Sequence, residues 1–138
     1  MTENSYNGNG PSSYVPARRR TITRATRPPC YYNENDADKA AWLRALISHN
    51  LIAPGDVDER SIDDVEPCDL ADYRQCHFFV GIGVWSYALR LAQWPDDRTV
   101  WTGSCPCTPF SVAGKQRGFD DDRHLWPAWH RLIRECRP

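Results

Sequence analysis

The sequence predicts an α/β domain with a parallel sheet of about four strands. Strand and helix patterns alternate from Tyr31 onward, which is typical of a parallel sheet with helical crossovers. A glycine pair directly follows the most hydrophobic strand, as in folds that bind nucleotide-like ligands. At 138 residues, with 41% hydrophobic and 25% charged side chains, the chain has the size and composition of one globular domain.

The first predicted elements are a strand over residues 31–34 and an amphipathic helix over residues 36–50. Asp36 stands where that helix needs a side-chain acceptor, so it is the candidate N-cap. Pro54-Gly55 then breaks the chain, and a short, mainly polar connector follows.

The clearest buried strand covers residues 75–80, and Gly81-Ile82-Gly83 turns it into a helix over about residues 85–92. A strand over residues 99–103 leads into a proline-rich loop, and the last helix covers residues 125–136. His77, inside the buried strand, is expected to be a structural histidine, and the alternative is a catalytic base. Most of the tryptophans are expected in the core, namely Trp85, Trp94, Trp101, Trp126 and Trp129.

Residues 1–28 are expected to form a disordered basic arm outside the domain, which then covers residues 29–138. The segment contains five arginines, with Glu3 as its one acidic residue, and is rich in Asn, Gly, Ser and Pro. The rest of the chain carries a net negative charge. The arm either contacts DNA phosphates or acts as a solubilising tail.

The loop Gly103-Ser104-Cys105-Pro106-Cys107-Thr108-Pro109-Phe110-Ser111 places a cysteine between two prolines. Proline fixes φ and lacks a backbone donor, so Cys107 is predicted to lie in a stiff, extended loop that presents its side chain. The alternative is a buried structural thiol. A metal site that adds His124, His130 or Cys136 to the Cys105–Cys107 pair matches zinc spacing poorly, so no metal is expected.

Two of these motifs carry a family resemblance. Pro106-Cys107-Thr108-Pro109-Phe110-Ser111 resembles the Pro-Cys-Gln-Pro-Phe-Ser loop of the cytosine-C5 DNA methyltransferases, with Thr108 in place of the glutamine. Phe79-Val80-Gly81-Ile82-Gly83 is similar to the Phe-x-Gly-x-Gly motif with which this family binds S-adenosylmethionine, although Val84 replaces a further glycine. The resemblance implies that Cys107 is the nucleophile that attacks carbon 6 of a flipped-out cytosine. The cofactor-binding residues that it implies here are Phe79, Gly81 and Gly83; for Phe79 the alternative is a core aromatic.

Two more segments resemble the family's second and third motifs. Tyr32-Asn33-Glu34 resembles the second, which implies that Glu34 binds the ribose hydroxyls of the cofactor; the alternative is an ordinary strand-end carboxylate. Gly55-Asp56-Val57 resembles the third, which implies that Asp56 meets the adenine amino group, with Asp58 as the competing candidate.

The motif order is therefore second, third, first, fourth, which is a circular permutation of the usual Rossmann-like methyltransferase order. A permutation keeps the sheet order 3-2-1-4 and changes only the connections. In this order the chain resembles a phage-associated branch of the family.

Beyond the cysteine loop, the resemblance implies that Ser111 contacts the DNA backbone. Lys115 and Arg117 follow in a glycine-bounded segment, where they contact phosphate or form part of a solvated loop. The chain ends after the next helix, before the family's later motifs and target-recognition domain. A second polypeptide is therefore expected to complete the enzyme, since an unpaired sheet edge exposes backbone groups.

Neither an apolar run of roughly 20 residues, as a membrane span requires, nor a signal peptide with a hydrophobic centre is found in the sequence. A cytoplasmic location is therefore expected, with the six cysteines reduced. The function that the resemblance implies is methyl transfer from S-adenosylmethionine to carbon 5 of cytosine in double-stranded DNA. The alternatives are an inactive remnant that binds DNA or a protein, and an RNA cytosine methyltransferase.

Overall fold

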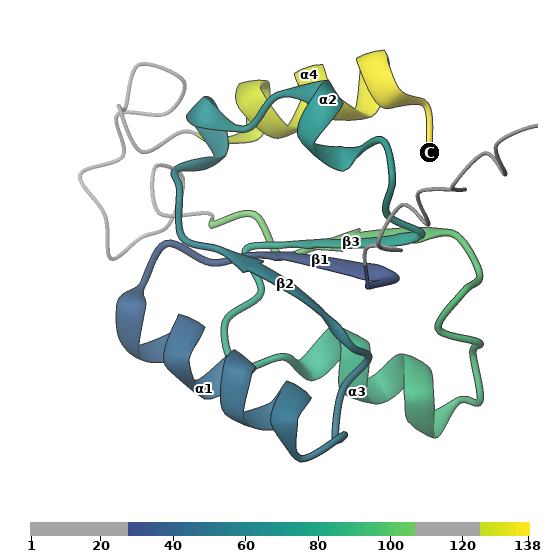
Figure 1. Ribbon diagram of the computed structural model, residues 1–138. Coiled ribbons are helices and arrows are strands. Elements are labelled where there is room, and N and C mark those ends of the chain that lie inside the picture. Colours follow the sequence, from purple (N-terminus) through teal and green to yellow (C-terminus); the bar gives the residue numbers. More distant parts are fainter. Residues whose placement is uncertain (1–27, 107–124) are drawn as a thin grey trace, which may run out of the picture.

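The structure is a computed structural model that describes residues 28–106 and 125–138 (Figure 1). The predicted basic arm lies almost entirely outside the described residues. Four predicted site residues also lie outside the described residues, namely Cys107, Ser111, Lys115 and Arg117.

The centre of the fold is a sheet of four parallel strands, in the order β2-β1-β3-β4. The strands are β1 (Cys30–Asn33), β2 (Gly55–Asp58), β3 (Gln75–Phe78) and β4 (Val100–Gly103). In register, Cys30 pairs with both Gly55 and Gln75, and Gln75 pairs with Val100. Because all four strands are parallel, their carboxyl ends meet at one edge of the sheet. The prediction of an α/β domain with about four parallel strands is confirmed.

Helices cover both faces of this sheet, as Figure 1 shows. On one face lie α1 (Ala37–Ser48) and α3 (Val84–Leu91); on the other lie η1 (Ile62–Asp64), α2 (Pro67–Leu70) and α4 (Trp126–Cys136). Asp36 caps α1 as predicted, because its carboxylate accepts the backbone N–H groups of Asp38 and Lys39 at 3.0 and 3.1 Å. The expected polar connector after Pro54 was too simple a description, since this segment contains β2, η1 and α2.

Each face of the sheet has its own hydrophobic core, because side chains alternate along a strand. Tyr31 joins the core under η1, α2 and α4, where its partners include Phe78 and Leu132. Tyr32 points the other way and packs with Leu43 of α1.

Two expectations about single residue types have different outcomes. His77 is a buried structural histidine, as predicted: its ring bonds Thr102 Oγ1 at 2.7 Å and Gln75 Oε1 at 3.3 Å, and burial lowers its pKa to about 4. The expectation for the tryptophans is wrong for Trp85 and Trp126, which are 47% and 44% exposed. Within the described residues, the structure contains no helix with the length and apolar character of a membrane span.

Candidate cofactor-binding site

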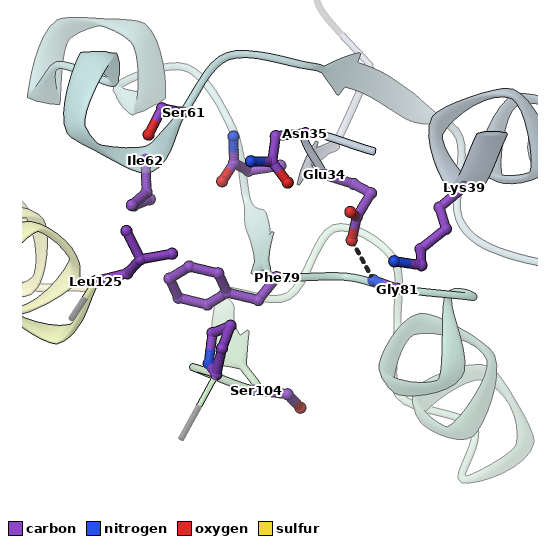
Figure 2. Close-up of a pocket in the computed structure, with 11 residues that line it drawn as sticks. Glu34, Asn35, Lys39, Ser61, Ile62, Phe79, Gly81, Ser104 and Leu125 are labelled. Atoms are coloured by element: carbon purple, nitrogen blue, oxygen red, sulfur yellow. Dashed lines mark hydrogen bonds between the residues drawn. The ribbon is translucent and has the colours of Figure 1, made fainter. Parts of the chain in front are cut away.

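A pocket of about 300 Å³ opens at the carboxyl ends of β1, β3 and β4 (Figure 2). In a parallel sheet this is the edge at which ligands bind, because the loops that leave the strands diverge there. The residues that line the pocket are Asn33, Glu34, Asn35, Lys39, Ser61, Ile62, Phe79, Gly81, Ser104, Pro106 and Leu125.

Glu34 links the two loops that form one side of this pocket. It follows β1 directly and is only 8% exposed. Its Oε2 accepts the backbone N–H of Gly81 at 2.7 Å (Figure 2), and its Oε1 accepts the N–H of Asp36 at 3.1 Å. Each carboxylate oxygen has a second lone pair, so Glu34 still has acceptor capacity for hydroxyl donors of a ligand.

The two glycines of the turn after β3 have different surroundings. Gly81 has φ of 58° and lines the pocket, and a Cβ added there would meet no atom within 4 Å. Gly83, with φ of 88°, precedes α3, where a Cβ would come within 3.1 Å of Leu43 and 3.2 Å of Leu46. Gly81 therefore leaves room for a ligand, whereas Gly83 allows α3 to begin close against α1.

Phe79 lies in the middle of the pocket wall. Its backbone adopts φ of 52°, in the left-handed region that side-chain-bearing residues rarely occupy. Its ring lies toward Leu125 in Figure 2 and meets the ring of Trp129 edge-on, with centroids 5.8 Å apart and an interplanar angle of 87°. The unusual φ turns this ring over the pocket at the point where β3 ends.

The structure does not bring Asp56 to this pocket. Asp56 lies inside β2, where Oδ2 accepts the hydroxyl of Tyr73 at 2.6 Å. Asp58, the competing candidate, ends β2 but is bound by Tyr31 at 2.8 Å and by the Arg60 guanidinium at 2.7 Å. The residues that line the pocket after β2 are instead Ser61 and Ile62.

The end of β4 leads along the pocket toward the predicted nucleophile. Ser104 and Pro106 both line the pocket, and the Ser104 hydroxyl oxygen accepts the indole N–H of Trp85 at 3.0 Å. Pro106 immediately precedes Cys107 in the sequence. The described part of this segment therefore ends in the lining of the same pocket that Glu34 and Gly81 also line.

Two buried cysteines elsewhere in the fold are unsuited to nucleophilic chemistry. Burial raises the pKa of Cys30 to about 12 and raises that of Cys76 as well, so both thiols stay protonated near neutral pH. The described cysteines form no disulfide. No cluster of three potential metal ligands occurs among residues 28–106 and 125–138.

Several pocket residues could not be identified from sequence motifs. Asn35 and Ser61 follow strands, Lys39 lies on the first turn of α1, and Leu125 is the last residue before α4. The ammonium of Lys39 pairs with Asp36 at 3.1 Å. The available signal was their position just beyond predicted strands or at helix starts, which is where ligand-binding residues of α/β sheets gather.

Comparison with known proteins shows what the C-terminal part of the chain is similar to. The sequence model of the C-5 cytosine-specific DNA methylases matches residues 88–138. A Type II methyltransferase of Neisseria gonorrhoeae, M.NgoMIV, is 56% identical over 43 residues, which are 31% of this chain and 14% of that protein. The chain thus matches a small part of its curated relative's length. No solved structure matches the chain. The predicted resemblance to the cytosine-C5 DNA methyltransferase family is confirmed for residues 88–138, which run from the second half of α3 through β4 to α4.

Proposed function

We propose that this chain supplies the cofactor-binding and nucleophile-bearing part of a DNA cytosine-C5 methyltransferase that uses S-adenosylmethionine. The observation that carries the proposal is that one pocket is lined both by the hydrogen-bonded pair Glu34 and Gly81 and by Ser104 and Pro106, which precede Cys107 in the sequence. The pocket is of a size that ligand sites have. The family match of the segment that contains Cys107 supports the same reaction.

The residues of the pocket fit the chemical groups of the cofactor. Glu34 offers acceptors to ribose hydroxyls, Gly81 leaves the backbone accessible, and Phe79 and Leu125 present apolar surface to the adenine ring. With Asp56 turned elsewhere, Ser61 takes its place as the polar candidate near the adenine. The bound cofactor would supply an electrophilic methyl group.

Cys107 acts as the nucleophile in this proposal. Carbon 5 of cytosine is a poor nucleophile within an aromatic ring, and addition of the Cys107 thiolate to carbon 6 makes it enamine-like and able to take the methyl group. Loss of the carbon-5 proton and departure of the thiolate then restore the ring. The target base must leave the duplex to reach the pocket, and Ser111, Lys115 and Arg117 are the proposed contacts to the DNA backbone.

We also infer a permuted motif order. The glycine turn follows β3, which is third along the chain but lies next to β1 and β4 in the sheet. The strand that Glu34 follows is first along the chain and second in the sheet. The order β2-β1-β3-β4 corresponds to the family's order 3-2-1-4 if the second and third motifs come first. This supports, in this protein, the order of the phage-associated branch.

The partner in this proposal is double-stranded DNA, together with a second polypeptide that completes the domain in the cytoplasm. The surface for the second polypeptide would be the free edge of β4, which has a single neighbour within the described sheet. Next to it, α3 exposes large apolar side chains. They include Val84, Trp85, Tyr87 and Leu91, which are 59%, 47%, 48% and 68% exposed. An open edge beside exposed apolar surface is unfavourable in water, and a strand-bearing partner would cover both.

Binding of S-adenosylhomocysteine, measured by titration calorimetry on the full chain, tests the first half of the proposal. Cys107→Ser should bind as the wild type does, because a nucleophile does not hold the cofactor, whereas Glu34→Gln should bind more weakly. No binding by the wild type, or equal binding by the Glu34 variant, would contradict the assignment of the pocket.

Trapping on a duplex that contains 5-fluorocytosine tests the second half. The reaction contains S-adenosylmethionine: once carbon 5 has taken the methyl group, its fluorine cannot leave as a proton does, so the adduct persists and can be detected on a denaturing gel. The chain is isolated from its native cells together with any polypeptide bound to it. In this complex we expect an adduct with the wild type and with Cys68→Ser, the matched control at an exposed cysteine, and none with Cys107→Ser. DNA binding without any adduct would favour the inactive remnant, and adducts on RNA alone would favour an RNA methyltransferase.

A further inference from the structure

Trp129 of α4 lies where two strands of the sheet end, although the proposed function gives it no part. Its ring centroid is 6.0 Å from that of Phe78, the last residue of β3, and 5.8 Å from that of Phe79, the first residue beyond. A third aromatic contact joins it edge-on to Trp126, at 5.5 Å. A single side chain of α4 therefore contacts the start of the glycine turn.

The same indole also fills the space beside the end of β4. A Cβ added to Gly103, the last residue of that strand, would overlap Cζ2 and Cη2 of Trp129. Glycine at this position is thus required by the tryptophan, and the two residues are matched in shape. Trp129 packs directly against the backbone from which Ser104 and Pro106 continue along the pocket.

The contact with Phe79 stabilises a backbone conformation that needs support. Residues with a Cβ adopt φ near 52° only when the surrounding structure compensates for the cost. The edge-on packing of the two rings is a favourable aromatic geometry, and it fixes the Phe79 ring where it lines the pocket.

We infer that Trp129 is a positioning residue that fixes two loops at once: it holds Phe79 over the cofactor pocket, and it fixes the end of β4 from which the chain reaches Cys107. This inference rests on the proposed function for the meaning of the two loops. Trp129 does not line the pocket, yet through these two loops it sets both the affinity for the cofactor and the presentation of the nucleophile. Cofactor binding and thiol reactivity should therefore change together when the Trp129–Gly103 contact is altered.

Three variants of the full chain separate this role from a general effect on stability. Gly103→Ala introduces the overlap, Trp129→Leu removes the ring contacts, and Gly103→Ala with Trp129→Phe combines the added methyl with a smaller ring. The indole Nε1 is buried and has no hydrogen-bond partner within the described residues, so replacement by phenylalanine sacrifices no such bond there. All measurements are made at a temperature at which circular dichroism shows each variant folded.

The two readouts are the affinity for S-adenosylhomocysteine and the alkylation rate of Cys107 by iodoacetamide, relative to exposed Cys68 in the same sample. Aromatic contacts of this kind correspond to roughly 2- to 10-fold in an equilibrium constant, so Trp129→Leu should weaken binding by about that factor. Gly103→Ala should weaken binding at least as much and change the Cys107 to Cys68 alkylation ratio at least about twofold. The double variant should return both quantities toward their wild-type values.

The inference is overturned if Trp129→Leu and Gly103→Ala are folded and leave both readouts at their wild-type values. It is equally overturned if the double variant behaves like Gly103→Ala alone, because then the indole is not what the methyl group meets. If the wild type itself binds no S-adenosylhomocysteine, the proposed function fails instead, and the alkylation ratio still decides whether Trp129 positions the Cys107 loop.

Discussion

Replacement of Glu34 by glutamine tests whether one buried carboxylate joins the two loops of the candidate site. In the wild type its two oxygens accept the N–H groups of Gly81 and Asp36 at 2.7 and 3.1 Å. Glutamine retains one acceptor oxygen, and its NH₂ group would face the other N–H donor. Losing one hydrogen bond to a charged group costs about 1.5–3 kcal/mol. The free energy of unfolding should therefore fall by about that amount even without ligand.

Urea unfolding followed by tryptophan fluorescence measures this loss, and Glu59→Gln is the matched control. Glu59 pairs with Arg44 at 2.6 Å, but their side chains are 43% and 51% exposed. An exposed ion pair contributes at most about 1 kcal/mol, so the control should lose less than the Glu34 variant. S-adenosylhomocysteine at 100 times its dissociation constant should add about 2.7 kcal/mol to the wild type and less to Glu34→Gln. Equal losses in the two variants would refute the role of Glu34 as the link between the loops.

Two further predictions concern the layers that support the site. Leu43→Ala should lower the free energy of unfolding by about 2–5 kcal/mol, because Leu43 is fully buried between α1 and the sheet. Trp42→Ala at a 53% exposed position should cost less than about 1 kcal/mol, and similar losses in the two variants would contradict the packing. The folded state holds His77 with its pKa lowered to about 4, below the unfolded value near 6.5, so the unfolded chain binds the proton more readily. The free energy of unfolding should therefore fall by up to about 3 kcal/mol as the pH drops from 6.5 to 4. His77→Asn should remove the share of this fall that comes from His77. If the variant loses as much stability over this pH range as the wild type, the role of His77 is contradicted.

Local patterns in the sequence were sufficient to predict many of the helices and strands. The apolar spacing of α1 and the N-cap at Asp36 depend on neighbours along the chain, and so does the buried hydrophobic run of β3. The predicted ends differ from the observed ones by one or two residues, because strand and helix ends fray into turns. These elements could be predicted because each depends mainly on nearby residues.

The segment after Pro54 could not be predicted in the same way. β2 has the sequence Gly-Asp-Val-Asp, which lacks the hydrophobic alternation of a recognisable strand. Its two aspartates are satisfied by Tyr73 and by Arg60, and its backbone pairs with β1. The strand exists because of these tertiary partners.

The sequence by itself determined the chemistry that this chain offers: a cysteine between prolines, a glycine turn after a buried strand, and a carboxylate at the end of another. Only the tertiary structure decided which of these groups meet. It brings Glu34 to Gly81 across the sheet edge, leaves Asp56 within β2, and adds Leu125, the residue just before α4, to the same pocket. The physical reason is that parallel strands from distant parts of the chain end side by side, so register and side-chain alternation select the residues that form the site.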